Sequence, residues 1–345
     1  MRLYEKWAED SKQIGLYNRK QQAQAVIYGL AIGDAIGVPF EFRERDTYTV
    51  KDMVGYGTYN LPAGTWSDDT SLTLALMEHL SERSKLSDLM DKFAAYRNGY
   101  LTPYGDCFDI GIATNQAIER YLAGNLPEES GGSGERDNGN GALMRISPLA
   151  LILRREFNFL AKVECIESYT KITHRHPRAI VGSILYIQIL IGLLLNNSLS
   201  ESLSGANSLF LDHLSKNTEY LKEFEENYQN IFSENFFETT RENIFSTGYV
   251  VDTLKAAIWC VGTTDSFKSA VLKAVNLGGD TDTIGAITGT LAGALYKIES
   301  IPEEWINNIA NKLLIDKKIR DFLYYFEELE YQKKGLKAHF RNRIR

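Results

Sequence analysis

Two short acidic stretches carry residue types that can hold a metal ion. The first reads Gly-Gly-Asp-Thr-Asp-Thr at 278–283, and the apolar run 284–295 that follows it is helical in character. Alternate residues of an extended loop point the same way, so we expect the carboxylates of Asp280 and Asp282 to aim at one point. The stretch therefore predicts a cation site at a helix start, where the helix dipole also favours carboxylates.

An ordinary N-cap would explain one such stretch equally well, because Asp and Thr are common at helix starts. A second stretch of the same design, Gly-Thr-Trp-Ser-Asp-Asp-Thr at 64–70, leads into another helical run at 72–80. Two acidic helix starts, far apart in the chain, can face one another across a helical bundle. Their ligand atoms would all be oxygens, which suit magnesium or manganese better than zinc.

Two other interpretations of 280–283 fail on spacing. A calcium-binding EF-hand loop needs ligands at the positions that Ile284 and Leu291 occupy. A phosphotransferase of the Asp-x-Asp-x-Thr type would place its aspartates directly after a buried strand, but Asn-Leu-Gly-Gly at 276–279 is a turn sequence. The spacing therefore disfavours both the calcium loop and the aspartyl-phosphate enzyme.

The composition indicates a globular protein without a nucleic-acid-binding face. The chain has 345 residues, is 44% hydrophobic and carries a net charge of −7, whereas binding phosphate backbones by charge needs a basic surface. Its three cysteines are far apart, which indicates neither disulfides nor a zinc cluster and fits a reducing cytoplasm. The first ten residues lack the apolar core of a signal peptide. We expect the apolar run 179–195, which polar residues interrupt, to be a core helix rather than a membrane span.

The first strongly patterned segment, 22–37, predicts a helix with glycines at 29, 33 and 37. Glycines four residues apart allow a neighbouring helix to approach closely, and we expect tight packing there. Pro39 marks the end of this helix and leaves Glu41 between two aromatic residues. We interpret Glu41 as a functional carboxylate rather than a solvated one.

Three further segments contain candidate binding residues. Asp109 precedes a helical run at 112–118 and, taken alone, is an N-cap or turn residue. The glycine-rich stretch 128–141 leads into an expected helix from 142, and free backbone N–H groups there can cradle an anion, although no standard nucleotide motif is present. His174 and His176 have no other ligand at zinc-site spacing, so we expect hydrogen-bonded loop histidines.

Tyr249 opens a helix at 249–259, and it is either a core aromatic or a platform on which a base stacks. The segment 196–245 is acidic, and we expect its glutamates to form a solvated face; they are Glu223, Glu225, Glu226, Glu234, Glu238 and Glu242. Helical patterns dominate and alternating strands are absent. We therefore expect one all-α domain at 22–328, an N-terminal extension at 1–21 and a basic tail at 329–345.

The sequence resembles the ADP-ribosylglycohydrolases in several blocks that follow the family's order. The matching blocks are 29–41, 66–70 (Trp-Ser-Asp-Asp-Thr), 109–111 (Asp-Ile-Gly), 139–145 (Gly-Asn-Gly-Ala-Leu-Met-Arg), 173–177 (Thr-His-Arg-His-Pro), 248–254 (Gly-Tyr-Val-Val-Asp-Thr-Leu) and 278–283. The resemblance implies an all-α orthogonal helical bundle with two magnesium or manganese ions at the bottom of a cleft.

The resemblance also implies roles for individual residues. Glu41 matches the acid that contacts a metal or its water, and Asp109 matches the loop acid near the reacting ribose. Tyr249 matches an adenine-stacking aromatic. The residues that match segments holding the diphosphate and riboses are Asn138, Gly139, Asn140, Gly141 and His174. The residues that match metal ligands are Ser67, Asp68, Asp69, Asp280, Asp282 and Thr283.

On this basis we expect a metal-dependent hydrolase that removes ADP-ribose from modified protein side chains, above all from arginine. An alternative from another class is an immunity protein that blocks a bacterial ADP-ribosyltransferase toxin by direct binding. In that case the extension 1–21 would bind the toxin, with Arg19 as a substrate mimic. The two functions can coexist in one protein.

Overall fold

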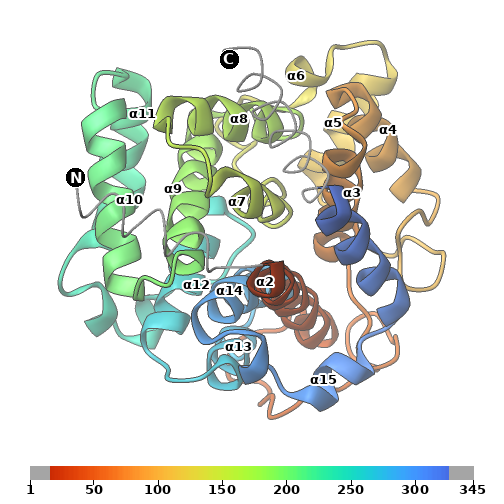
Figure 1. The fold of residues 1–345 in the computed structure, drawn as a ribbon. Coiled ribbons are helices and arrows are strands. Elements are labelled where there is room, and N and C mark those ends of the chain that lie inside the picture. Colours follow the sequence, from red (N-terminus) through yellow and green to blue (C-terminus); the bar gives the residue numbers. More distant parts are fainter. Residues whose placement is uncertain (1–15, 326–345) are drawn as a thin grey trace, which may run out of the picture.

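Helices form nearly all of the regular structure in residues 16–325, the part of the chain that the computed structural model describes (Figure 1). No strand occurs in that range, and its only β-type pairings are isolated bridges between Gly132 and His174 and between Gly139 and Tyr249. The prediction of an all-α fold is confirmed.

The named elements follow in chain order. They are α2 (Leu16–Gly37), η1 (Val38–Phe40), α3 (Asp68–Glu82), α4 (Leu86–Tyr96), α5 (Ile112–Leu122), α6 (Pro127–Ser130), α7 (Pro148–Leu153), α8 (Phe159–Lys171), α9 (Pro177–Leu194), α10 (Leu199–Leu214), α11 (Thr218–Glu223), η2 (Phe224–Tyr228), η3 (Gln229–Phe232), η4 (Phe236–Glu238), η5 (Arg241–Asn243), α12 (Val250–Gly262), α13 (Phe267–Val275), α14 (Thr281–Tyr296), η6 (Ile298–Ser300) and α15 (Glu303–Asn308). A further helix occupies 312–325.

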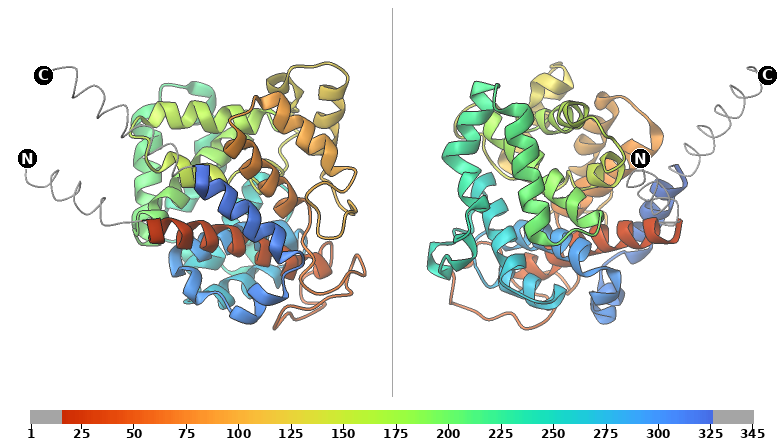
Figure 2. Two further views of the ribbon diagram at one scale, coloured as in Figure 1. Left: turned by 45° about the vertical axis from the view of Figure 1, so that its right-hand side comes forward. Right: turned by 60° about the vertical axis from the view of Figure 1, so that its left-hand side comes forward.

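The helix pair α2 and α14 forms the centre of the fold and its most extensive helix contact. Figure 1 looks along α2, with α3 to α5 on one side and α9 to α11 on the other, and Figure 2 shows α2 (red) from the side against the blue segment that contains α14. The backbones touch through glycines: a Cβ built on Gly33 would lie 2.0 Å from the carbonyl oxygen of Gly285. The predicted close approach is confirmed, and its partner is the helix that starts at the acidic stretch 278–283.

Replacing Gly33 by alanine is expected to destabilise the protein by about 2–3 kcal/mol, because the methyl group would have to push two helix backbones apart. Gly205→Ala is the matched control, since Gly205 lies within α10 and a Cβ there has nothing within 4 Å. That control should gain about 0.5–1 kcal/mol from helix propensity. Urea unfolding followed by circular dichroism measures both changes. Equal stabilities of the two variants would contradict the tight contact.

The apolar run 179–195 forms α9, and the prediction of a core helix is confirmed. Two helical stretches, Arg19–Phe40 and Pro177–Leu194, are long and apolar enough to cross a membrane by length and composition. In each of them 89% of the most apolar window is buried inside the fold. Such burial is typical of the central helices of a globular domain.

Two expectations are wrong in detail. No helix begins directly after the glycine-rich stretch: residues 141–145 form turns, and α7 starts at Pro148. Glu223 does not belong to a solvated face, because it is buried and its carboxylate lies 2.7 Å from Nε of Arg178. A charged group buried in this way is stabilised by pairing, which the local sequence pattern does not reveal.

The first described helix begins six residues before the predicted start of the domain at 22. The helix α2 begins at Leu16, so 16–21, assigned above to an extension, is continuous with the central helix. Arg19 lies within this helix and is partly buried, beside Arg154. Residues 1–15 and 326–345, which hold the rest of the predicted extension and the whole basic tail, lie outside the described residues.

Candidate active site

Buried and half-buried carboxylates converge in a cleft of about 870 Å³. Glu41, Asp280 and Asp282 each offer one oxygen within 4.8 Å of the others. Asp68 and Asp109 line the same cleft. The five acids come from four separate segments of the chain, so the fold gathers candidate residues that the sequence places far apart.

The start of α14 positions two of these acids. Asp280 is the N-cap and the helix begins at Thr281, so Asp282 lies in the first helical turn and not on an extended loop as expected. The preceding Gly278 and Gly279 have φ angles of 75° and 73°, which residues with a Cβ rarely adopt. A Cβ on Gly279 would also lie 2.2 Å from the carbonyl oxygen of Ser246. Both glycines are therefore needed for the backbone to enter the helix at this angle.

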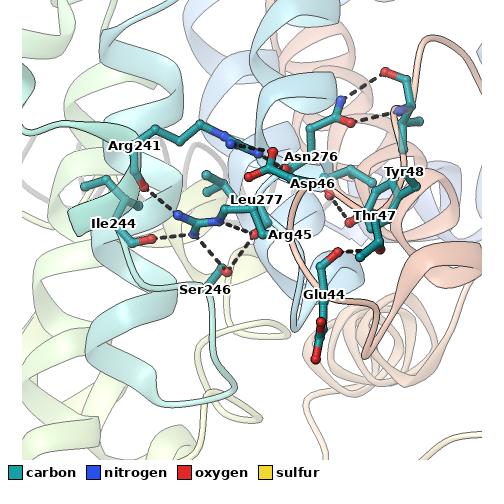
Figure 3. Close-up of polar contacts among 12 residues, drawn as sticks. Glu44, Arg45, Asp46, Thr47, Tyr48, Arg241, Ile244, Ser246, Asn276 and Leu277 are labelled. Atoms are coloured by element: carbon teal, nitrogen blue, oxygen red, sulfur yellow. Dashed lines mark hydrogen bonds and ion pairs between the residues drawn. The ribbon is translucent and has the colours of Figure 1, made fainter.

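The guanidinium of Arg45 holds the residue that precedes this glycine turn, Leu277, close to Ile244 (Figure 3). Its Nε donates a hydrogen bond to the carbonyl oxygen of Leu277 at 2.7 Å, and its terminal nitrogens donate to those of Arg241 and Ile244 at 2.5 and 2.6 Å. One guanidinium thus joins the loop after Glu41, the segment around η5 and the turn before Asp280. These bonds hold the acidic start of α14 against both neighbouring loops.

The start of α3 supplies the second acidic group, and it lies beside the first. The side chain of Thr283 donates to Oδ2 of Asp69 at 3.2 Å, which links α14 to α3 directly. Ser67 is the N-cap of α3 and its hydroxyl accepts from the backbone N–H of Asp69 at 3.3 Å. The two helix starts therefore face one another, as the sequence predicted.

Asp34, from the middle of α2, holds the start of α3 in place. Its buried carboxylate accepts the backbone N–H of Ser67 at 2.9 Å and the hydroxyl of Thr70 at 2.5 Å. A carboxylate that caps free N–H groups at a helix start replaces the water those groups would otherwise bind. The sequence analysis did not assign this role to Asp34. The signal that could have indicated it is a single acid within the apolar and glycine-containing segment 30–37.

The acids are crowded enough to resist ionisation together. Burial, followed by the charge of Asp109, raises the pKa of Glu41 to about 8. Burial, followed by the charge of Asp280, raises the pKa of Asp109 to about 6. Burial and the charges of Glu41 and Asp280 raise the pKa of Asp282 well above its ordinary range. Such a cluster needs positive charge to be stable with all its carboxylates ionised.

The donor set fits divalent cations. Oδ1 of Asp69 is buried and has no hydrogen-bond partner, which is costly for a carboxylate oxygen unless an ion takes that place. The ligand atoms at both helix starts are carboxylate and hydroxyl oxygens, the donors that magnesium and manganese prefer. Among the described residues, Glu41, Asp280 and Asp282 form the one group whose oxygens lie close enough to share an ion as they stand.

The glycine-rich stretch forms another wall of the cleft, together with His174. Gly139, Asn140 and Gly141 line it, and the side-chain amide of Asn140 donates to Oδ2 of Asp280 at 2.7 Å. A Cβ on Gly141 would lie 2.9 Å from Cε1 of His174, so the loop packs on the imidazole. Burial lowers the pKa of His174 to about 3, which keeps the ring neutral. The wall therefore offers backbone and amide N–H groups near the acids.

The comparisons with known proteins agree with this arrangement. The family model for ADP-ribosylglycohydrolase matches residues 16–333. The chain belongs to the ADP-ribosylglycohydrolase family.

Similar proteins include enzymes named for two kinds of substrate. The chain is 33% identical over 319 residues to an ADP-ribosylarginine hydrolase Tri1 of Serratia proteamaculans, covering 90% of this chain and 81% of the relative. It is 29% identical to the ADP-ribosyl-[dinitrogen reductase] glycohydrolase of Rhodospirillum rubrum, covering 87% and 93%. A solved structure of an ADP-ribosylglycohydrolase-related protein complex superimposes with a TM-score of 0.71 at 29% identity, covering 90% of this chain and 99% of that one.

Four candidate residues of this family member do not belong to the cleft lining: Ser67, Asp69, Asn138 and Tyr249. Ser67 and Asp69 lie at the start of α3, as described above. The side-chain amide of Asn138 turns back into its own loop and donates to the carbonyl oxygen of Glu135 at 3.1 Å. Tyr249 is half-buried, and its hydroxyl donates to Oδ1 of Asn227 at 3.3 Å. The guanidinium of Arg178 lies 5.8 Å from the centre of its ring. Tyr249 forms an isolated bridge with Gly139, and both Gly139 and the residue before Tyr249, Gly248, line the cleft.

His176 has a local structural role in this fold. It is the N-cap of α9, and its Nδ1 accepts the backbone N–H of Arg178 at 3.1 Å. His174 instead lies in the cleft wall, with its Nδ1 2.9 Å from the hydroxyl of Thr173. Both are hydrogen-bonded histidines, as the sequence predicted.

Tyr59 is a site residue that sequence reasoning missed. Its hydroxyl donates to Oε2 of Glu41 at 2.6 Å, and its ring packs on Phe108 at 4.9 Å between centroids. The bond fixes one carboxylate oxygen of Glu41 and leaves the other for a ligand. The loop that carries Tyr59 has no periodic pattern, so no local signal pointed to this contact.

Replacing Tyr59 by phenylalanine is expected to lower kcat about fivefold to tenfold, because Glu41 loses the hydrogen bond that orients it. Tyr104→Phe is the control: it removes a tyrosine hydroxyl that lies 3.3 Å from Oγ1 of Thr65 and has no bond to Glu41, and it should leave kcat unchanged. Initial-rate kinetics on an ADP-ribosylated arginine peptide measures both. The same loss in the two variants would show that the effect is not specific to Glu41.

Proposed function

We propose that the chain hydrolyses the bond between C1 of an ADP-ribose unit and the guanidinium of a protein arginine, with the help of two magnesium or manganese ions. The observation that carries the proposal is the convergence of Glu41, Asp280 and Asp282 within 4.8 Å in the lining of the cleft. The names of two relatives, ADP-ribosylarginine hydrolase Tri1 of Serratia proteamaculans and of Pseudomonas putida, support arginine as the modified residue.

The starts of α3 and α14 would hold the ions. The proposed ligands are Ser67, Asp68, Asp69, Asp280, Asp282 and Thr283, all of them oxygen donors. When bound, such ions act as Lewis acids that bind ribose hydroxyls and lower the pKa of a bound water.

Glu41 and Asp109 have the geometry of a base and a charge stabiliser. Glu41 keeps one oxygen on Tyr59 and lies among the acids at the bottom, where it can take a proton from the attacking water. The loop of Asp109 is fixed because the hydroxyl of Tyr96 donates to the Asp109 carbonyl oxygen at 2.5 Å. Its carboxylate can then stabilise the positive charge that develops on the sugar ring during glycosidic cleavage.

The wall beside these acids is suited to the rest of the nucleotide. We assign the diphosphate and riboses to the stretch Asn138–Gly139–Asn140–Gly141 and to the neutral His174, because its glycines line the cleft and allow a phosphate to approach the backbone closely. We assign the adenine to Tyr249, whose ring is partly exposed next to this stretch. A neutral imidazole can donate or accept without adding charge next to the acids.

The activity is tested with two defined substrates, a peptide carrying ADP-ribose on arginine and a peptide carrying it on serine, each with and without a chelator. Release of ADP-ribose from the arginine peptide, lost with the chelator and restored by magnesium or manganese, is the expected result. Faster turnover of the serine peptide would overturn the linkage, and full activity of a rigorously metal-free preparation would overturn the metal requirement.

A cytoplasmic location fits the cysteines, since none of the three forms a disulfide.

The alternative function, direct blocking of an ADP-ribosyltransferase toxin by the extension 1–21, depends mainly on 1–15, which lie outside the described residues. Arg19 is a residue of α2 and packs beside Leu151 and Arg154. Toxin binding therefore stays a prediction of the sequence.

A further inference from the structure

Two large apolar side chains line the cleft and yet remain exposed. Phe42 is 71% exposed and Ile112 is 78% exposed, whereas the acids Glu41, Asp68 and Asp282 are buried. Side chains that border a cleft and still face water lie at its mouth. Single exposed apolar residues are common on protein surfaces. These two, however, border the entrance of a binding cleft, where an exposed apolar side chain can contact a bound partner.

The backbone of Phe42 is tied to the acidic start of α14. Its N–H donates to the carbonyl oxygen of Gly279 at 2.8 Å, and the N–H of Gly279 donates to that of Arg43 at 2.9 Å. The φ angle of Phe42 is 64°, in the left-handed region that glycine occupies more easily than phenylalanine. A left-handed backbone alone does not distinguish Phe42, because Tyr56 in the same loop has a φ of 60°. Phe42 differs from Tyr56 in that it lines the cleft.

Ile112 is tied to the other acidic helix start. It is the first residue of α5, directly after Gly111, whose backbone N–H donates to Oδ2 of Asp68 at 3.2 Å. Each exposed apolar side chain is therefore at most one residue away from a backbone hydrogen bond to the segments that carry the acids. Their positions relative to the bottom of the cleft are set by these short connections.

We propose that Phe42 and Ile112 form an apolar rim that binds the polypeptide on either side of the modified arginine in an ADP-ribosylated protein. The proposal rests on the function proposed above. If C1 of the ribose lies at the buried acids, the arginine side chain must leave through the mouth, and its backbone then crosses the rim. Apolar contacts there add binding energy that is equal in the ground state and the transition state, so they lower KM and leave kcat unchanged. The rim should favour arginines with apolar neighbours.

The experiment compares two substrates that share the reacting bond. One is the free amino acid ADP-ribosylarginine, and the other is a peptide in which leucines flank the ADP-ribosylated arginine. Phe42→Gly removes the ring and accepts the left-handed backbone, and Ile112→Ala keeps the start of α5. Tyr56→Gly is the matched control, because Tyr56 is also 71% exposed and left-handed but does not line the cleft.

For each of Phe42→Gly and Ile112→Ala we expect kcat/KM on the peptide to fall roughly tenfold through KM, as burial of one apolar side chain on binding would give. Turnover of the free amino acid should stay within about twofold of the parent, and Tyr56→Gly should change neither substrate. An unchanged peptide KM, or an equal loss on both substrates, would overturn the rim. If the parent protein cleaves the free amino acid but shows no preference for the peptide, the proposed activity stands and the rim falls. If the parent cleaves neither substrate, both proposals fail.

Discussion

Replacing Asp282 by asparagine is expected to lower kcat by about a thousandfold or more, because the buried carboxylate that we propose as a metal ligand becomes a neutral amide and ion binding weakens. The metal-free variant should at the same time be more stable than the metal-free parent, by about 1 kcal/mol at neutral pH, since one of several repelling acids has been neutralised. Asp282 is 1% exposed, and burial together with Glu41 and Asp280 raises its pKa well above the ordinary range.

Initial rates and thermal unfolding with and without magnesium measure these opposite effects. Asp212→Asn is the control, because Asp212 is an exposed carboxylate on α10 and should change neither quantity. A parallel loss of activity and of stability in Asp282→Asn would show a structural role instead.

Asp280→Ala and Asp68→Ala should also abolish hydrolysis while the circular dichroism spectrum keeps its helical form.

The second large effect is a loss of stability of the metal-free protein as the pH rises. Burial and the charge of Asp109 raise the pKa of Glu41 from its ordinary 4.5 to about 8, and burial raises the pKa of Asp34 from 3.8 to about 7. At a pH between the ordinary pKa of each group and its raised pKa, the folded protein keeps a proton that the unfolded chain has already released. Folding therefore becomes less favourable as the pH rises. The stabilisation is complete below about pH 4.5 and is lost as the pH passes through about 8.

For Glu41 alone the loss amounts to roughly 3–5 kcal/mol, at about 1.4 kcal/mol for each unit of pKa. Unfolding in urea across this pH range, in the presence of a chelator, measures it. Saturating magnesium should remove most of the dependence, because bound cations compensate the ionised acids in place of protons. A metal-free protein whose stability rises between pH 5 and pH 8 would show that the acids are paired in some other way.

The sequence predicted those features that depend on local pattern. Glycines at 29, 33 and 37 predicted a close helix contact, because nothing but small side chains at that spacing allows backbones to touch. Oxygen donors at two helix starts predicted a metal site, and the fold brings Asp69 and Thr283 within hydrogen-bonding distance. The family resemblance supplied the expected roles of the individual residues.

Other features depend on contacts between distant segments and had no local signal. Arg45 donates hydrogen bonds to backbone carbonyl oxygens, which every residue type has, so the sequence of its partners cannot reveal these bonds. Tyr59 reaches Glu41 from an irregular loop, so no periodicity pointed to it. The pairing of Glu223 with Arg178 buries a residue that its acidic surroundings assigned to the surface. In each case tertiary packing decided what local composition did not.

The glycine contact between α2 and α14 has a consequence for how substrate preference can change in evolution. Glu41 follows η1, which continues directly from α2, and Asp282 lies in the first turn of α14, so the spacing of these two acids depends on two main chains that already touch. A substitution of a larger side chain elsewhere on either helix cannot bring those main chains closer together. The side chains of Phe42 and Ile112 are exposed and therefore are not held by such packing. New target proteins can therefore be acquired by changes at the mouth of the cleft, while the hydrolytic chemistry is inherited unchanged.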